Sequence, residues 1–305
     1  MYVIKYRKFW FVLSGLLMAL SAFGIFKYGF NLSIDFKGGT ITEVRYEGDL
    51  SAQAGRMDKA VVEENIEKLS ASWRIGGFSV RPSESDRYII RTKELSIEES
   101  AKLIEAIGNP GVERSNTIGP IAGGELQSKA VKAILVVVIM IVLFVTFAFR
   151  KVSLPVSSWK YGFATIIALV HDVVIPTGIF VFLGHISGLE IDLLFVTGLL
   201  AILGYSVHDT IVVFDRVREN LRINSDRNQN EEFDITVGKS VQQTFGRSIN
   251  TSLTIFITLF ALYLFGSSAT HDFALLLMIG VIVGTYSSIF VASPLLVTFQ
   301  KLQKK

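Results

Sequence analysis

Ionisable residues lie within three of the most apolar stretches of the sequence. His171 and Asp172 are adjacent in one stretch, His208 and Asp209 in a second, and Arg247 opens a third. If these stretches cross a membrane, each ionisable group costs several kcal/mol unless it is paired or hydrated, so each is a functional candidate. The chemistry open to such residues inside a membrane is the binding and transfer of protons.

Asp209 and Arg247 are the pair best suited to this chemistry. A carboxyl group isolated at low dielectric constant favours its neutral form, whereas a neighbouring Arg favours the ionised form. Asp209, set against Arg247, could therefore alternate between a protonated state and an ion-paired state, which is the elementary step of a proton relay. A static ion pair that only fixes helix packing is the alternative.

Further polar residues accompany this pair at helical spacing. From Arg247, polar residues recur at i+3, i+4, i+7 and i+11, so they share one helix face. His171 and Asp172 either line the same hydrated cavity or only bond a neighbouring helix. The accessory candidates for a relay are His208, His171, Asp172, Tyr205, Ser206, Asn250 and Thr251.

Other kinds of site find little support. Adjacent His and Asp side chains on a helix point about 100° apart, unlike the i, i+4 spacing of metal ligands on helices. No HExxH, GxSxG or Walker sequence is present. We therefore predict no catalytic residue, no metal site and no enzymatic activity. The motif at Asp35, Gly38 and Gly39 predicts a tight turn before a strand, because glycine adopts backbone angles closed to other residues.

Six segments are long and apolar enough to cross a membrane. A hydrocarbon core of about 30 Å needs roughly 20 apolar residues in a helix. Four runs without a charged residue are evident, and two more qualify if one acid in each is tolerated. The predicted spans are residues 9–26, 133–149, 160–183, 191–214, 248–270 and 273–300.

The charges orient these spans. The net charge of +3 combines a block at 27–132, with 15 Lys/Arg and 16 Asp/Glu, and a remainder in which the bases exceed the acids. Outside that block, Lys and Arg occur only before span 1, between spans 2 and 3, between spans 4 and 5, and after span 6. This pattern is typical of cytoplasmic loops. The apolar run at 9–26 is longer than the apolar core of a signal peptide and is not followed by a small-residue cleavage site. Both features favour a membrane anchor.

The block between the first two spans predicts an external α+β domain. Strand and helix patterns follow one another as βαββαβ, the order of a ferredoxin-like split sandwich. Ser96 and Glu99 form a capping box before one helix. The predicted organisation is a cytoplasmic N-terminus with helix 1 at 1–28, the external domain at 29–128, and helices 2–6 at 129–305, with a cytoplasmic connector at 215–240 and a cytoplasmic C-terminal tail.

Small residues follow the sixth span at four-residue intervals. Gly280, Gly284, Ser288 and Ala292 form a stripe that lets another helix approach closely. We predict helix packing there, within this bundle or against a second subunit. The segment 215–239 is expected to be a solvated connector, with an amphipathic helix along the inner membrane surface as the alternative.

The chain as a whole resembles the SecF family, the smaller membrane subunit of the SecD–SecF protein-export complex. The layout agrees, and the motifs that carry the resemblance are DFKGGT at 35–40, GYSVHDTIVVFDRVREN at 204–220, QTFGRSINTS at 243–252 and IGVIVGTYSSIFVASPL at 279–295. The resemblance covers essentially the whole chain. His208 departs from the family, where Asn is often found, and adds a titratable group beside Asp209.

The resemblance implies a fold and a function. It implies half of a pseudo-symmetric twelve-helix bundle of the resistance-nodulation-division superfamily, in the bacterial cytoplasmic membrane. The implied partners are SecD, the SecYEG channel, the SecA motor, an unfolded preprotein and membrane lipid, with no nucleic acid. The implied activity uses the proton-motive force to promote late translocation and release of exported proteins, with H⁺, or alternatively Na⁺, as coupling ion and no cofactor. Asp209 and Arg247 match the family's proton pathway, and a further family Asp lies in SecD.

Two other functions remain open from the sequence. A small-molecule or lipid exporter of the same superfamily would share the membrane relay but would normally have a larger external region and both halves of the bundle. A structural membrane scaffold would need no Asp/Arg pair.

Overall fold

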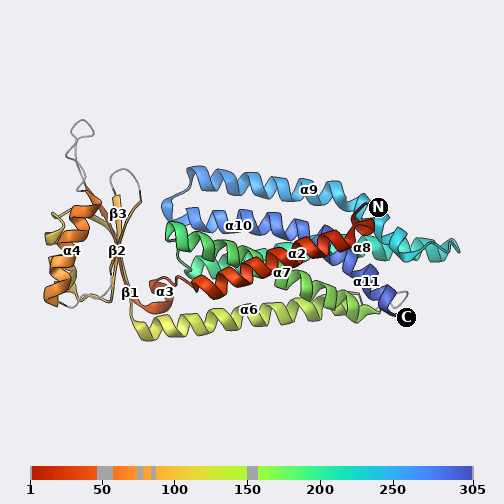
Figure 1. The fold of residues 1–305 in the computed structure, drawn as a ribbon, viewed down its shortest axis with the longest axis horizontal. Helices are drawn as coiled ribbons and strands as arrows, with labels where there is room; N and C mark the ends of the chain where they lie inside the picture. The colour runs from red at the N-terminus through yellow and green to blue at the C-terminus, as the bar shows by residue number, and fades with distance from the viewer. Residues whose placement is uncertain (1, 47–57, 74–77, 84–86, 150–156, 304–305) are drawn as a thin grey trace. The chain divides into compact units, whose positions relative to one another are not determined.

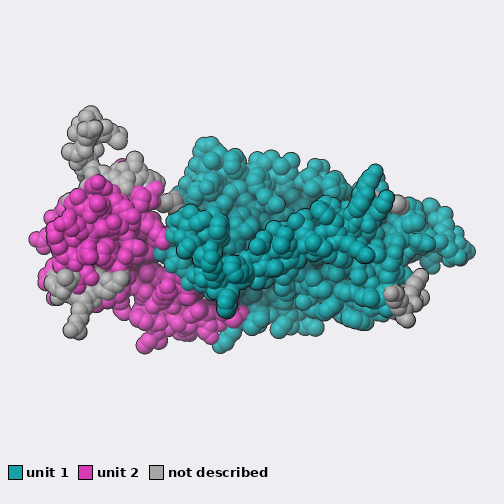
Figure 2. Space-filling view, in the orientation of Figure 1, with its two compact units in different colours: residues 1–31, 132–305 teal, residues 32–131 magenta. Residues whose placement is uncertain are grey.

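The computed structural model of the protein describes residues 2–46, 58–73, 78–83, 87–149 and 157–303. The chain divides into two compact units, Leu32–Val131 and Met1–Asn31 with Lys132–Lys305, coloured magenta and teal in Figure 2. The smaller unit contains a β-sheet, and the larger unit is a helical bundle (Figure 1).

The smaller unit is built on a four-stranded antiparallel sheet in the order β2-β3-β1-β4. The chain alternates between strands and helices as βαββαβ, as the sequence predicts for a ferredoxin-like domain. Its elements are α3 (Ile34–Lys37), β1 (Gly39–Arg45), α4 (Lys59–Trp73), β2 (Ser79–Pro82), β3 (Arg87–Thr92), α5 (Ile97–Ala106) and β4 (Gly111–Ile118).

Local sequence explains these elements. The side chains of β1 alternate between buried and less buried positions, as expected for a strand with one face on a core. The predicted capping box starts α5: Ser96 Oγ accepts from Glu99 N (3.2 Å), and Glu99 Oε2 accepts from Ser96 N (2.8 Å). These bonds lower the pKa of Glu99. The core of the unit consists of Val44, Val62, Ile66, Val80, Tyr88, Ile90, Leu95, Leu103 and Ile107.

Two adjacent glycines make the turn that leads from α3 into β1. Gly38 has φ +78° and Gly39 has φ +137°, in the region that favours glycine. A Cβ atom on Gly38 would lie 2.8 Å from the backbone of Pro120, and one on Gly39 would lie 2.5 Å from the carbonyl oxygen of Thr92. Asp35 lies in the first turn of α3, and its N–H is capped by Ser33. Close backbone approach therefore requires glycine at both positions.

The larger unit contains the six membrane-length helices that the sequence predicts. They are α2 (Arg7–Tyr28), α6 (Pro120–Ala148), α7 (Ser158–Ser187), α8 (Leu193–Asp226), α9 (Phe233–Phe265) and a final helix of α10 (Ser268–Ser287), the π-helical turn η1 (Ser288–Ala292) and α11 (Ser293–Gln303), preceded by the short α1 (Tyr2–Lys5). In α7, α8 and the final helix, 56% to 61% of the residues in the most apolar 18-residue segment are buried. In α2, α6 and α9 the buried share of that segment is 11%. The former three make the centre of the bundle, and the latter three leave most of their surface uncovered by this chain.

The helices run past the uncharged segments of the sequence. The helix α8 continues to Asp226 and α9 starts at Phe233, so most of the expected connector at 215–240 is helical and continues these two helices. Arg247 lies inside α9, at the start of its uncharged segment. Hydrophobicity marks the thickness of the membrane, whereas helix ends are set by backbone bonding and by ion pairs such as Arg216 with Glu219 (2.6 Å).

The extended ends of α8 and α9 are joined by polar contacts. Asn220 Nδ2 donates to Ser240 Oγ and to Gln243 Oε1, both at 2.8 Å. Glu231, between the two helices, pairs with Lys239, and this contact lowers the pKa of Glu231. The two helices are thus bonded to each other beyond their apolar segments.

The small-residue stripe of the final helix packs against α8 of the same chain. A Cβ atom on Gly280 would collide with the side chain of Ile202, and one on Gly284 would lie 3.2 Å from Cβ of Ser206. Ser288 continues the stripe and bonds to Thr210 Oγ1 (2.8 Å). Of the two packing surfaces that the sequence left open, the structure uses the one within the bundle.

Candidate functional site

Asp209 lies in the middle of the bundle on α8 and is 5% exposed. The hydroxyl of Ser248 on α9 donates to its Oδ1 at 2.5 Å. Its Oδ2 is buried and has no hydrogen-bond partner among the described residues. A buried carboxyl oxygen without a partner is costly, above all in the ionised form, so Asp209 is a candidate for proton binding.

Arg247 does not pair with Asp209 in this chain. No ion pair joins the two among the residues that the structure covers, and the side chain of Arg247 is exposed. The reason is helical geometry: Ser248 faces α8, and the preceding residue on α9 points about 100° away. The expected partner of Asp209 is thus replaced by Ser248, which the sequence analysis missed although it stands beside Arg247 in the GRSINTS segment.

The rest of the polar face of α9 is also uncovered. The residues are Arg247, Asn250, Thr251, Thr254 and Thr258, which we call the α9 polar stripe, and all five are exposed. The hydroxyls of the last two donate to carbonyl oxygens of the same helix. His208 of α8 is exposed as well and does not face the centre of the bundle. A polar stripe on a membrane helix calls for a polar partner outside this chain.

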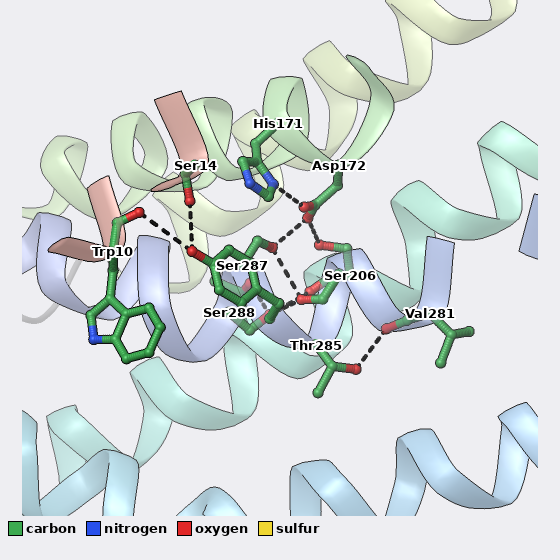
Figure 3. A network of polar contacts seen from close by, with 12 residues as sticks. Trp10, Ser14, His171, Asp172, Ser206, Val281, Thr285, Ser287 and Ser288 are labelled. Atoms are coloured by element: carbon green, nitrogen blue, oxygen red, sulfur yellow. Dashed lines mark hydrogen bonds and ion pairs between the residues drawn. The ribbon is translucent and has the colours of Figure 1, made fainter. Parts of the chain in front are cut away.

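A second carboxyl group, Asp172 on α7, is fully buried and is held by three donors from three helices (Figure 3). His171 Nδ1 lies 2.9 Å from Oδ1, and Ser287 Oγ donates to Oδ2 at 2.6 Å. Ser206 Oγ of α8 donates to the same Oδ2. His171 and Asp172 therefore lie inside the bundle and bond both to each other and to the neighbouring helices.

The ring of His171 packs against Tyr286 of α10, which in turn contacts α2. It stacks on Tyr286 with ring centroids 5.8 Å apart. The Tyr286 hydroxyl contacts Ser14 Oγ (3.0 Å) and donates to the carbonyl oxygen of Trp10 (3.3 Å). His171 is 1% exposed, and its Nε2 has no partner in the described part of the chain.

Hydroxyl groups fill the space between the two aspartates. Ser288 Oγ lies 2.8 Å from Thr210 Oγ1 and 3.4 Å from the carbonyl oxygen of Ser206. Thr210 is the residue after Asp209. Ser206 and Ser287 bond to Asp172, so consecutive serines of the final helix reach the surroundings of both carboxyl groups.

Tyr205 belongs to a neighbouring hydroxyl cluster. Its hydroxyl lies 2.6 Å from Ser252 Oγ of α9, which in turn lies 2.6 Å from Thr285 Oγ1 of α10. Ser252 donates to the carbonyl oxygen of Ser248, the partner of Asp209 (2.7 Å). Tyr205 and Ser206 therefore face different polar groups, because successive side chains diverge around the helix.

Two of the helices that surround Asp172 contain a proline. Pro176 lies inside α7 and has no N–H to donate to the carbonyl oxygen of Asp172, four residues earlier. Pro294 follows η1, where the helix widens to a π-helical turn, and the Ser293 hydroxyl donates to the carbonyl oxygen of Ser288 (2.8 Å). Such turns are frequent at functional sites because they redirect neighbouring side chains.

The arrangement suits proton binding better than metal binding. Among the described residues, no group of three or more His, Cys, Asp or Glu side chains could hold a metal ion. Two buried carboxyl groups, a buried imidazole and a series of hydroxyls provide groups that accept and donate protons.

Comparison with known proteins adds a family to this geometry. A model described as "Protein export membrane protein SecD/SecF, C-terminal" matches residues 99–302, and another, "SecD/SecF GG Motif", matches residues 23–49. The protein translocase subunit SecF of Thermobaculum terrenum is 39% identical and aligns over 98% of this chain and 93% of its own length. SecF of Haemophilus influenzae is 35% identical over 95% of this chain and 83% of its own length.

One relative is a longer protein whose name joins SecD and SecF. The protein translocase subunit SecDF of Thermus thermophilus is 36% identical over 95% of this chain, which covers 37% of that protein. A crystal structure described as SecDF, a translocon-associated membrane protein, matches 99% of this chain and 39% of its own with a TM-score of 0.80 at 33% identity.

Proposed function

The chain belongs to the SecF family of protein translocase subunits, and from this premise we propose that it acts with a SecD partner as an ion-driven motor. It uses the proton-motive force, with H⁺ as coupling ion and Na⁺ as the alternative, to promote late translocation and release of exported proteins. The observation that carries this proposal is Asp209, a buried carboxyl group on a membrane helix with one oxygen bonded to Ser248 and the other without a hydrogen-bond partner among the described residues.

The α9 polar stripe supports the choice of partner. Arg247 and the four polar residues that follow it are exposed on a membrane helix. A charged side chain in that position needs a counter-charge or water. We place the membrane part of SecD against this stripe, with a SecD carboxyl group opposite Arg247. The fusion of both names in the SecDF relative fits this arrangement.

The family and the charges support the remaining partners and the location in our proposal. The clustered Lys and Arg residues favour cytoplasmic termini, and in this orientation the sheet unit lies outside a bacterial cytoplasmic membrane. There it meets an unfolded preprotein that SecA has driven into the SecYEG channel and that emerges on the outer side.

The available energy is of the right size. One charge that crosses the membrane potential is worth about 2.3 kcal/mol per 100 mV. That energy shifts a two-state equilibrium by tens of fold. In our proposal, protonation of Asp209 changes its bond to Ser248, the packing of α8 against α9 changes with it, and the sheet unit moves while it holds the exported chain.

The test is Asp209→Asn in membrane vesicles that contain SecYEG, SecA and the SecD partner. We expect completion of translocation to slow to the rate seen when an ionophore collapses the gradient, because the amide cannot exchange a proton. Asp215→Asn is the matched control, since it removes an exposed Asp of the same helix. A full gradient-dependent rate with Asp209→Asn would contradict the proposal.

A further inference from the structure

His171 and Asp172 lie apart from the contact between Asp209 and Ser248, and the proposed function makes no use of them. We propose that they form a second proton-binding site, which is coupled to Asp209 through the serines of the final helix. The inference deepens the proposed function and rests on it for its role in export. The buried state of both side chains and the unpartnered Nε2 of His171 are the observations that carry it.

The donors around Asp172 define its usual state. The hydroxyls of Ser206 and Ser287 both donate to Oδ2, and His171 Nδ1 donates to Oδ1 when it carries the proton. Three donors and no acceptor stabilise an ionised carboxylate. No Lys or Arg pairs with Asp172 within the described ranges, so only the imidazole can supply a compensating charge.

Each protonation state of the pair leaves one group unsatisfied. With a neutral imidazole, the carboxylate is buried without a counter-charge and Nε2 is a bare acceptor. With a protonated imidazole, the charges compensate each other, but the Nε2–H lacks an acceptor. Neither protonation state satisfies every buried polar atom of the pair, so its contacts favour neither state outright.

The surroundings contain few other groups that titrate. The helix α10 places Tyr286 on the face of the His171 ring, and α8 carries Asp209 one turn after Ser206. The helix α2 contributes only the hydroxyl of Ser14 and the carbonyl of Trp10, both through Tyr286. The pair is therefore most sensitive to Asp209, the nearest carboxyl group on an adjoining helix.

The serines provide the coupling. A proton on His171 gives Asp172 a charged partner at Oδ1, and this changes the strength of the bonds that Ser206 and Ser287 donate to Oδ2. These bonds tie α8 and α10 to α7. The next residue, Ser288, contacts Thr210 beside Asp209. A change at Asp172 therefore reaches the helix that positions Asp209.

The test uses ring-nitrogen NMR of the full chain in lipid, with the signals of His171 assigned by comparison with His171→Gln. We expect the spectrum to change with pH from the Nδ1–H form to the doubly protonated form. Asp172→Asn and Asp209→Asn should each move the midpoint by about one pH unit, as for interacting sites. His271→Gln removes an exposed His and is the control.

The functional arm measures how gradient-driven translocation depends on pH. His171→Gln and Asp172→Asn should change the shape of this profile, and Asp172→Glu should restore it in part. If Asp172→Asn does not fold, Ser287→Ala replaces it in this test, because it removes only one donor to Asp172. If the ring-nitrogen signals of His171 do not change with pH, or do not change in Asp172→Asn, the pair only fixes helix packing and the inference is wrong.

The two proposals fail separately. If Asp209→Asn leaves export unchanged while His171 titrates together with Asp172, the proposed function is wrong and the second proton site stands. If Asp209 is needed but His171 does not titrate, only the inference is wrong.

Discussion

At the scale of single residues, the environment of a side chain decides its chemistry more than its type does. Asp172 and Asp209 are both buried carboxyl groups, yet the first has three donors and the second has one. His171 is enclosed, whereas His208 is exposed. Two His-Asp dipeptides that look alike in the sequence therefore have different roles in the structure.

Tyr46 gives a prediction outside the membrane. Its hydroxyl donates to the carbonyl oxygen of Ile107 (2.8 Å), and burial, with a smaller contribution from Tyr88, raises its pKa from 10.0 to about 12. Because the folded pKa is raised, the stabilisation is complete below about pH 10 and is lost as the pH rises through about 12. Since Tyr46 is only partly buried and solvent weakens the effect, we expect its burial to contribute only about 1 kcal/mol to stability.

Urea unfolding of the full chain on either side of that pH range checks this prediction. Tyr46→Phe should remove the extra loss of stability of the sheet unit at alkaline pH. Tyr2→Phe, which changes an exposed ring of the other unit, is the control. An unchanged pH dependence in Tyr46→Phe would contradict the prediction.

At the scale of elements, close packing of the final helix on α8 positions the polar residues of both. Gly280 and Gly284 bring the two helices together, and Ser287 at the end of α10 and Ser288 at the start of the π-helical turn bond to α7 and α8. Pro176 lies one turn after Asp172 in α7, and Pro294 lies just beyond η1. The close packing of the helices and the irregular turn together bring the hydroxyls of Ser287 and Ser288 to their partners on α7 and α8.

Gly280→Ala tests the packing. The added carbon collides with Ile202, so we expect a loss of about 1–3 kcal/mol, measured as a lower unfolding temperature in detergent. Gly246→Ala on α9 is the matched control, because no atom lies within 4 Å of the added carbon. The double variant Gly280→Ala/Ile202→Ala should recover part of this loss. If Gly280→Ala is as stable as the control Gly246→Ala, the packing argument is wrong.

Ser293→Ala tests the π-helical turn. It removes the buried hydroxyl bond to the carbonyl oxygen of Ser288, and we expect a loss of about 1–2 kcal/mol together with slower gradient-driven export. Thr298→Val on the same helix loses a hydroxyl bond to Pro294 (3.0 Å) outside the turn and is the control. Thermal unfolding and the vesicle assay are the measurements. Wild-type export by Ser293→Ala would show that the turn has no part in the motor.

At the scale of the whole molecule, the chain is half of a larger membrane unit in our proposal. The helices α2, α6 and α9 leave most of their apolar windows unburied, and only α9 adds a polar stripe to its exposed face. Lipid can cover an apolar face, whereas the stripe calls for a protein partner. The proposed site is therefore completed outside this chain.

The orientation of the chain can be tested with single cysteines, because the sequence has none of its own. Glu98→Cys in the sheet unit should react with a membrane-impermeant maleimide in intact spheroplasts. Gln229→Cys, between α8 and α9, should react only after the membrane is opened; both positions are exposed. The reverse labelling pattern would contradict the proposed location of the sheet unit.

The sequence by itself determined the six spans, the order of strands and helices in the sheet unit, the capping box and the family. These features depend on runs, periods and short motifs, which are local properties of the chain. Only the tertiary structure decided that Ser248 contacts Asp209, that Arg247 faces outward, and that Ser206 and Ser287 converge on Asp172. The physical reason is that each partner depends on how a helix is rotated about its axis and on which helix lies next to it, and contacts distant in the chain fix both.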